Sequence, residues 1–339
     1  MRGKTQYIHY AVLTAAAAFA ACCFLSVSVA QAADSAARDS WRAALDQSQP
    51  GEGCFTATYP STQWQAVECK DLHPRVHPRI RRSAVGQVTG NGHDYVAQSS
   101  GLTQKAMGSF PTATGITSEK SVGVAQFGGG GILGPNEYSL QLNTNFGSAT
   151  AACNGSTTGD CIVWEQFIYA TDYETEGEAA VFIQNWLINW GDTSCPKGFA
   201  SDGEGDCYGN SKAVSAPDVS PKSLANVTLK GAVAGGGSDT VTFTNGTTAY
   251  AVSEPDTTLD ISQVWQQSEF NVVGDAGGSR AQFNKGVTLS VKVALTDGST
   301  SAPACVSNEG TTGESNNLNL GACGTAGGSM PYIKFNESN

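Results

Sequence analysis

Short runs of alternating or β-branched residues, separated by Gly, Pro, Asn and Asp, dominate the chain from residue 106 onward. Such alternation points successive side chains to opposite faces and is typical of half-buried β-strands. Turn signals such as Asn245-Gly246 and Asp297-Gly298 separate neighbouring runs. We expect strands at residues 138–146, 162–170, 180–190, 223–231, 240–244, 247–252, 259–264, 268–274, 287–295 and 332–335. The pattern predicts one all-β domain, a two-sheet sandwich over residues 106–339.

The first 32 residues have the features of a secretory signal peptide. Two basic residues, Arg2 and Lys4, precede a long apolar stretch, and Ala30-Gln31-Ala32 is a small-residue cleavage pattern. Cys22 leaves open the alternative of a lipoprotein anchor. We therefore expect a secreted protein, extracellular or periplasmic, that has no membrane partner.

Residues 33–105 differ in composition from the predicted sandwich. One short helix is expected near residues 40–47, and a basic run interrupted by prolines follows at residues 73–82. We interpret this segment as a propeptide or N-terminal extension, so the protein would be made as a zymogen. A solvated arm that is not processed is the alternative reading.

Eight cysteines remain once Cys22 and Cys23 are assigned to the signal peptide. An even number in an exported chain favours disulfides over thiol chemistry. No C-x-x-C pair or nearby histidine favours zinc. Close sequential pairs make local bridges the simplest pairing: Cys54 with Cys69, Cys153 with Cys161, Cys195 with Cys207, and Cys305 with Cys323.

The charge distribution and the missing motifs narrow the possible functions. Residues 1–105 hold 10 Lys and Arg against 7 Asp and Glu, and the rest of the chain holds 9 against 23. So acidic a domain is not expected to bind nucleic acid. No histidine follows His93 and no G-x-S-x-G occurs, which excludes a Ser-His-Asp or Cys-His site in the sandwich. The acidic turn Asp202–Asp206 resembles a calcium loop but lacks the EF-hand spacing, so we expect no metal and no cofactor.

Two predicted strands carry polar residues suited to acid–base chemistry. In Cys161–Tyr169, alternation places Trp164, Gln166 and Ile168 on one face, although a one-residue change of register would expose Glu165 instead. In the second strand, Glu269 and Asn271 share a face. A carboxylate and an amide that meet on one sheet face can activate water and stabilise an oxyanion, which is the chemistry of peptide hydrolysis in acid.

The same strands resemble those of the glutamic peptidases of the eqolisin (G1) family. The resemblance rests on Ser268–Val273 followed by Arg280–Leu289, on Trp164–Phe167, and on the aromatic strand Phe182–Trp186, in the same order along the chain. It implies a lectin-like curved β-sandwich of the concanavalin or jelly-roll type, made as a preproenzyme. It also implies a catalytic dyad of Gln166 and Glu269.

The leading hypothesis from the sequence is a secreted, acid-acting glutamic endopeptidase, monomeric, with protein or peptide substrates. Substrate contacts are expected at Trp164, Trp186 and Asn271. One alternative is a non-catalytic lectin-like sandwich that binds carbohydrate or another surface ligand through exposed aromatic rings. Another is a structural exported protein.

Overall fold

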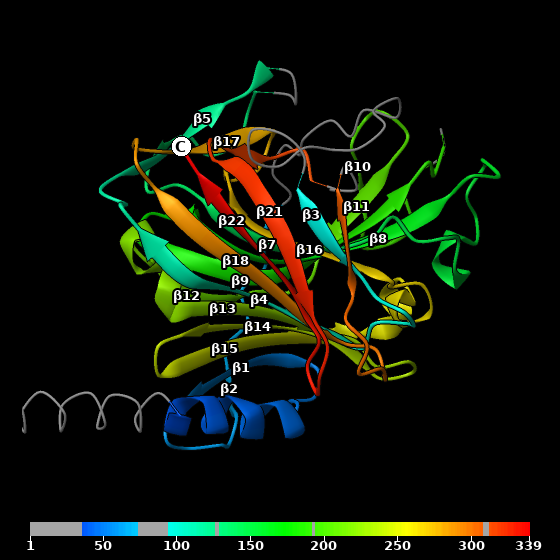
Figure 1. Ribbon diagram of the computed structural model, residues 1–339. Helices are drawn as coiled ribbons and strands as arrows, with labels where there is room; N and C mark the ends of the chain where they lie inside the picture. The colour runs from blue at the N-terminus through cyan, green and yellow to red at the C-terminus, as the bar shows by residue number, and fades with distance from the viewer. Residues whose placement is uncertain (1–35, 74–93, 126–128, 192–193, 308–311) are drawn as a thin grey trace, which may run out of the picture. The chain divides into compact units, whose positions relative to one another are not determined.

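Alternating strands from distant parts of the chain build a β-sandwich of two large antiparallel sheets, as the sequence predicts (Figure 1). The computed structural model describes residues 36–73, 94–125, 129–191, 194–307 and 312–339. The expected signal peptide and most of the basic run at 73–82 lie outside these residues. The described part of the chain contains no helix long and apolar enough to cross a membrane.

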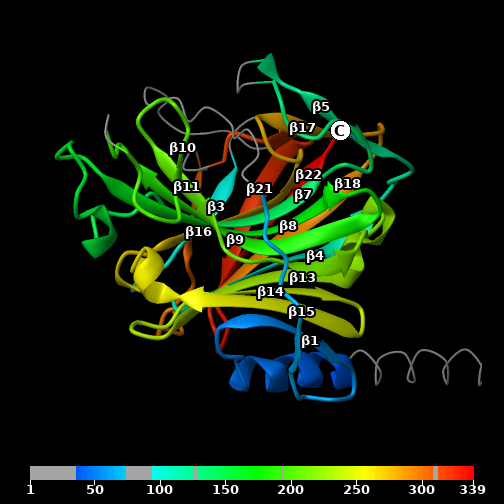
Figure 2. The ribbon, with the colours of Figure 1, turned by 180° about the vertical axis from the view of Figure 1, so that it is seen from behind.

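The first sheet has nine strands within the described residues. Their order is β2 (Gln65–Val67), β1 (Gly53–Thr58), β15 (Thr248–Pro255), β14 (Ser238–Asn245), β13 (Val227–Ala232), β4 (Lys105–Thr114), β18 (Thr288–Thr296), β22 (Tyr332–Ser338) and β21 (Asn319–Ala326). In Figure 2, β13, β14 and β15 follow one another as neighbours. The β14–β15 hairpin turns at the expected Asn245-Gly246, where Gly246 adopts a φ of 57° that suits glycine.

The second sheet also has nine strands among the residues described. Its order is β10 (Ala200–Ser201), β11 (Cys207–Asn210), β9 (Glu178–Ile188), β8 (Ile162–Thr175), β7 (Ser139–Thr144), β16 (Gln267–Val273), β3 (Tyr95–Gln98) and β19 (Ala304–Ser307), and β12 (Val214–Pro217) also pairs with β9. Strand β7 therefore lies between β8 and β16, the two strands that carry the predicted dyad.

A small sheet and short 3-10 turns complete the described structure. The sheet runs in the order β20 (Ser315–Asn316), β17 (Ser279–Phe283), β5 (Glu119–Gly123) and β6 (Gly134–Pro135). The 3-10 turns are η2 (Ala151–Cys153), η3 (Pro221–Asn226), η4 (Asp256–Thr258) and η5 (Ile261–Gln263).

Two glycines let the large sheets approach closely. A Cβ atom on Gly108 of β4 would lie 2.0 Å from the ring of Phe270 on β16. A Cβ atom on Gly231 of β13 would lie 2.3 Å from the ring of Phe167 on β8. Since real atoms cannot approach so closely, the rings occupy the space that these two residues leave open. Phe270 and Phe167 thereby mark the inner face of the second sheet.

One predicted strand is wrong. Residues 259–264 form the 3-10 turn η5 and its flanks rather than a strand. The carboxylate of Asp256 holds this turn, because Ser262 donates to it from both its backbone N, at 3.1 Å, and its Oγ, at 2.8 Å. Asp260 adopts a left-handed φ of 55°. Leu259 and Ile261 are buried and alternate with polar residues as in a strand. The hydrogen bonds to Asp256 hold the backbone in a turn despite this pattern.

The segment assigned to an extension contributes to both sheets. Strands β1 and β2 join the first sheet next to β15, and β3 joins the second sheet between β16 and β19. These pairings join residues far apart in the sequence, which local pattern does not reveal. Processing within residues 33–105 stays a prediction.

Residues 36–49 and 58–63 form a small separate unit. Residues 36–47 are helical, as expected around residues 40–47, and Trp41 and Leu45 are buried. The indole Nε1 of Trp41 donates to the carbonyl of Ser61 at 2.6 Å, and its ring lies edge-on to Tyr59.

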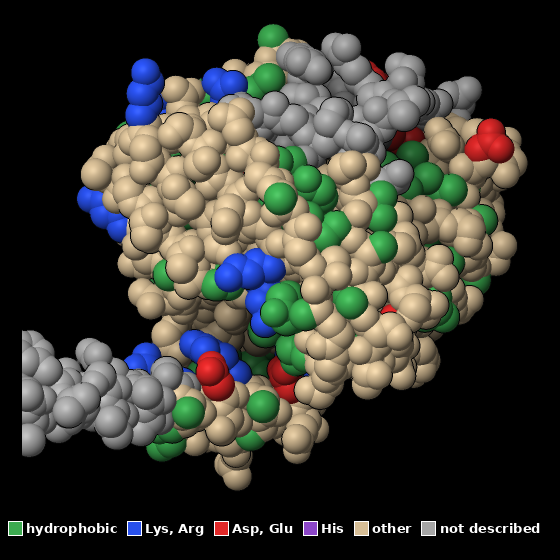
Figure 3. Space-filling model, viewed as in Figure 1, with side chains coloured by type: hydrophobic (Ala, Val, Ile, Leu, Met, Phe, Trp, Pro, Cys, Tyr) green, Lys and Arg blue, Asp and Glu red, His purple; other side chains and the backbone are tan. Residues whose placement is uncertain are grey.

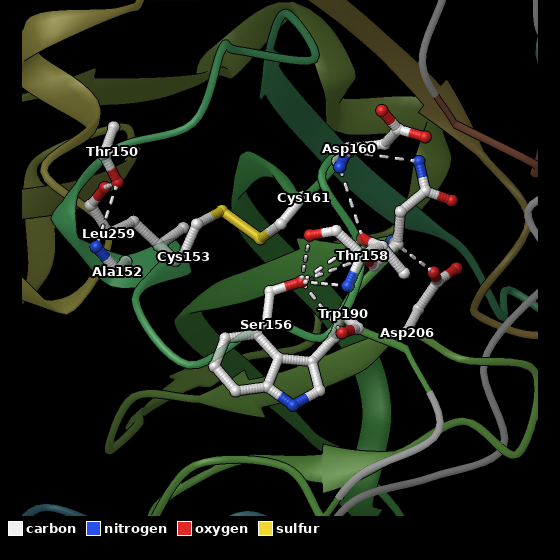
Figure 4. The surroundings of a disulfide bond; sticks show 11 residues. Thr150, Ala152, Cys153, Ser156, Thr158, Asp160, Cys161, Trp190, Asp206 and Leu259 are labelled. Atoms are coloured by element: carbon white, nitrogen blue, oxygen red, sulfur yellow. Dashed lines mark hydrogen bonds between the residues drawn. A yellow bond between two sulfur atoms is a disulfide. The ribbon is translucent and has the colours of Figure 1, made fainter.

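The four expected local disulfides are present: Cys54–Cys69, Cys153–Cys161, Cys195–Cys207 and Cys305–Cys323. Figure 4 shows Cys153–Cys161, which closes the loop before β8. In this loop Ser156 Oγ donates to the carbonyl of Trp190 at 2.9 Å. The bridge and this bond fix the entry of β8 against the end of β9.

Candidate active site

The two faces of β8 have different environments. Val163, Glu165 and Phe167 point between the sheets, where Val163 and Phe167 belong to the main hydrophobic core. Trp164 and Gln166 point to the opposite side, which we call the outer face of the second sheet. The register question that the sequence left open is thus settled in favour of Gln166 on this face, with Glu165 turned inward.

A row of polar side chains crosses the outer face. Asn143 on β7 pairs directly with Gln166 on β8 and with Glu269 on β16. Residues directly opposite one another in antiparallel strands project from the same face. The row continues as Gln184 on β9 and Asn210 on β11, each opposite its neighbour. We call these five residues the polar row.

Hydrogen bonds in the polar row run from Gln166 toward Glu269, whereas Gln184 Nε2 donates the other way, to Asn210 Oδ1 at 2.8 Å. Gln166 Nε2 donates to Asn143 Oδ1 at 3.2 Å, and Asn143 Nδ2 donates to Glu269 Oε2 at 3.3 Å. Trp186 Nε1 donates to Gln166 Oε1 at 3.2 Å and to Gln184 Oε1 at 2.9 Å. Because the indole can only donate, it fixes which end of the Gln166 amide faces Asn143. The predicted dyad is therefore connected through one amide, that of Asn143.

An aromatic row flanks the polar row. Trp164, Trp186 and Tyr208 lie opposite one another on β8, β9 and β11. The ring centroids are 5.9 Å apart for the two tryptophans and 5.2 Å for Trp186 and Tyr208. Both tryptophans are only 1% exposed. Both pack the outer face and offer no open ring surface, and Trp186 also positions Gln166 through its hydrogen bond.

Gln166 is 3% exposed and Glu269 is 2% exposed. The sequence predicts substrate contacts from Asn271 as well, yet its amide Nδ2 donates to Asp94 Oδ2 at 3.3 Å and to Glu337 Oε1 at 2.6 Å. Asn271 is 2% exposed and lies away from the pocket described next.

A small pocket of about 20 Å³, partly open to solvent, adjoins the polar row. Gln166 and Gln184 belong to both. Apolar side chains lie beside them on the same strands, and two acidic side chains complete the lining, which consists of Gln141, Gln166, Ile168, Tyr173, Phe182, Gln184, Asp275, Ala276 and Glu314. Polar side chains thus converge beside apolar ones around a space about as large as one water molecule.

Sequence reasoning missed Gln141, Asn143 and Glu314 as site residues. A signal for the first two exists, since Leu140 and Leu142 alternate with them in β7 and are fully buried. Glu314 has no such signal, because it reaches the pocket from a loop far along the chain.

A second polar group lies between the two large sheets. Glu165 and Asn185 from the second sheet face Asp239 and Glu254 from the first, and Asn185 Nδ2 donates to Glu254 Oε1 at 2.7 Å. Burial, with repulsion from Asp239, raises the pKa of Glu165 well above its ordinary value. Burial, with repulsion from Asp256, raises the pKa of Asp239 to about 9. Burial likewise raises the pKa of Glu254 to about 7.

Carboxyl groups with raised pKa values occur elsewhere in the structure too. Burial is the main cause at each of these sites: Glu119, Asp218, Glu314 and Glu337. On the face seen in Figure 3 the described surface carries few acidic side chains. Each of these buried carboxyl groups therefore keeps its proton to a higher pH than an exposed one would.

Among the described residues, no group of three or more potential ligands is placed to hold a metal ion. In the acidic turn Asp202–Asp206, carboxylate oxygens accept hydrogen bonds from backbone N–H groups. Asp202 Oδ1 accepts from the backbone N of Glu204 at 2.8 Å and of Asp206 at 3.0 Å. Asp206 Oδ1 accepts from the backbone N of Asn189 at 2.7 Å.

The fold and site define a two-sheet β-sandwich with a carboxylate and amide row on the outer face of one sheet. No protein-family model and no curated protein matches the chain. Among solved structures, it is similar to scytalido-glutamic peptidase with a transition state analog inhibitor, at 10% identity and a TM-score of 0.30, over 73% of this chain and 97% of that one.

A second similar structure is SCP-B, a member of the eqolisin family of peptidases, in a complex with the tripeptide Ala-Ile-His. Its identity is 12% and its TM-score 0.27, over 72% of this chain and 96% of that one. Likeness at this level is a distant resemblance of fold and says nothing of activity.

Proposed function

We propose that this protein is a secreted, acid-acting glutamic endopeptidase that hydrolyses peptide bonds with Glu269 and Gln166. The observation that carries the proposal is the direct register of Gln166, Asn143 and Glu269 across three adjacent strands, with the amides donating toward the carboxylate. A carboxylate and amide N–H groups on one face supply a base and oxyanion donors.

In the proposed reaction, the Glu269 carboxylate takes a proton from water, whose oxygen attacks the carbonyl carbon of the substrate. The N–H groups of Gln166, and of Asn143 beside it, donate to the oxygen that becomes negative. Asn143 now fills the space between the two residues, so substrate has to replace its bond to Glu269. In the simplest scheme Glu269 then returns the proton to the leaving amine.

The lectin-like alternative lacks a supporting observation. Stacking on a sugar requires an open ring face, and both Trp164 and Trp186 are buried against their neighbours. Both rings fit a packing role better, and Trp186 also positions Gln166.

Cleavage of a denatured protein at about pH 3 tests the proposal, and we expect Glu269→Gln and Gln166→Ala to lower kcat/KM by about 10²–10³-fold or more. Glu337→Gln is the matched control, because Glu337 is equally buried but accepts from Asn271 and Asn316 outside the pocket. It should retain cleavage. An inert wild-type protein, or full activity in the Glu269 variant, would refute the assignment.

A further inference from the structure

Gln166 has a second buried carboxyl group in its surroundings besides Glu269. Glu314 lines the same pocket as Gln166, whereas Glu269 is not among the lining residues. Glu314 is 3% exposed. A group that lines the pocket can touch a bound ligand directly, so its chemistry bears on what happens there.

The loop that carries Glu314 is fixed by its own hydrogen bonds. The backbone N of Gly274, at the end of β16, donates to the carbonyl of Ser315 at 3.1 Å. The side chain of Asn316 donates to the carbonyl of Val272 at 3.1 Å and to Glu337 Oε2 at 3.2 Å. These bonds attach the loop to the strand that carries Glu269. Glu314 is therefore held in place by the same strand.

One amide connects Gln166 with each carboxyl group. Gln166 Nε2 donates to Gln141 Oε1 at 3.2 Å, and the Gln141 side chain in turn hydrogen-bonds to Glu314. On the other side, Asn143 connects Gln166 with Glu269. Gln141 and Asn143 are two residues apart on β7 and share the outer face. The Gln166 amide thus lies between two acids.

The surroundings of Glu314 favour a proton on it. Burial raises the pKa of Glu314 above its ordinary value, although hydrogen bonds from Thr312 and Gln141 act in the opposite direction. Two carboxyl groups in different surroundings can hold different protonation states at one pH, as an acid and a base require.

We infer that Glu314 is the general acid of the site and protonates the leaving amine, while Glu269 is the base. This rests on the proposed function and divides its two proton transfers between two residues. Water loses a proton to Glu269 and forms the C–O bond. The C–N bond then breaks as the Glu314 O–H proton passes to nitrogen. Exchange with bulk water returns Glu269 to the carboxylate and Glu314 to the acid.

A pair of substrates that differ only in the leaving group tests the inference. A peptide amide needs a proton on its leaving nitrogen, whereas the matched p-nitrophenyl ester releases p-nitrophenolate, an anion stable enough to leave without one. At about pH 4 we expect Glu314→Gln to lower kcat/KM for the amide by about 10²-fold and for the ester by less than about tenfold. Glu269→Gln should impair both substrates.

Asp275→Asn is the matched control, because Asp275 is the other acid that lines the pocket. It should leave the ratio of the two rates unchanged. The inference is overturned if Glu314→Gln impairs both substrates equally, if it impairs neither, or if the Asp275 variant shows the selective loss. A wild-type protein that cleaves neither substrate refutes the proposed function itself.

Thr312→Val provides a second test should Glu314→Gln fail to fold. Thr312 Oγ1 donates to Glu314, which favours the ionised carboxylate. Its loss should raise the pKa of Glu314 and move the alkaline limb of amide cleavage to higher pH, without moving that of the ester. An unshifted amide profile would overturn the inference.

Discussion

Asp239 offers a direct test of whether buried carboxyl groups make the folded protein more stable at low pH than at neutral pH. Its side chain is 0% exposed and lies between the sheets beside Glu165 and Glu254. Asp239→Asn keeps the shape of the side chain and removes its charge. At low pH, where Asp239 is neutral, the substitution should change stability little.

The size of the expected change in stability follows from the proton that Asp239 keeps in the folded state. The pKa of Asp239 is raised from 3.8 to about 9, so between these values the folded state binds a proton that the unfolded state has released. Stability therefore falls as pH rises through this window, by about 1.4 kcal/mol per pH unit. By pH 7 the cost reaches about 4 kcal/mol, an upper value because Glu165 titrates together with Asp239.

The free energy of unfolding can be measured at about pH 3, 5 and 7 by urea unfolding followed by tryptophan fluorescence, with the disulfides intact. We expect Asp239→Asn to match wild type at the lowest pH and to be more stable by up to about 4 kcal/mol at the highest. Asp160→Asn, at an exposed position, controls for the substitution itself. Equal destabilisation of Asp239→Asn at every pH would refute the reasoning.

Two further substitutions probe packing and the site. Gly108→Ala should lower the free energy of unfolding, measured by thermal unfolding, by about 1–3 kcal/mol, because its Cβ would lie 2.0 Å from Phe270. Gly324→Ala is the control and should cost less, since the nearest atom to its Cβ would lie 3.9 Å away. Equal losses in the two variants would contradict the close approach of the sheets. Trp186→Phe keeps a ring but removes the donor to Gln166, and we expect peptide cleavage to fall about tenfold, the equivalent of one hydrogen bond. Trp164→Phe is its control, since the Trp164 indole N–H has no hydrogen-bond partner among the described residues, and a similar loss there would contradict the positioning role.

Part of the candidate site could be read from local alternation. The period of two in β8 and β16 places Trp164 with Gln166 and separates Glu269 from Phe270, and the structure shows these relations. The failure at residues 259–264 shows the limit of this signal, since the Asp256 side chain captures backbone that alternation assigns to a strand.

Other parts of the site could not be predicted because they depend on pairing between distant segments. Alternation does not say that β7 lies between β8 and β16, so the role of Asn143 as the bridging amide was hidden. Nor does alternation say which face of β8 is covered by the other sheet. That packing decides whether Gln166 or Glu165 lies on the outer face with the polar row.

The sequence by itself determined the all-β class and the sets of residues that share a strand face, because each depends on neighbours along the chain. It made local disulfide pairs the simplest expectation, which the structure bears out. Tertiary structure alone decided that Glu165 meets Asp239 between the sheets and that Glu314 enters the pocket beside Gln166. These contacts join residues many positions apart, and their energies depend on burial, which exists only once both sheets have packed.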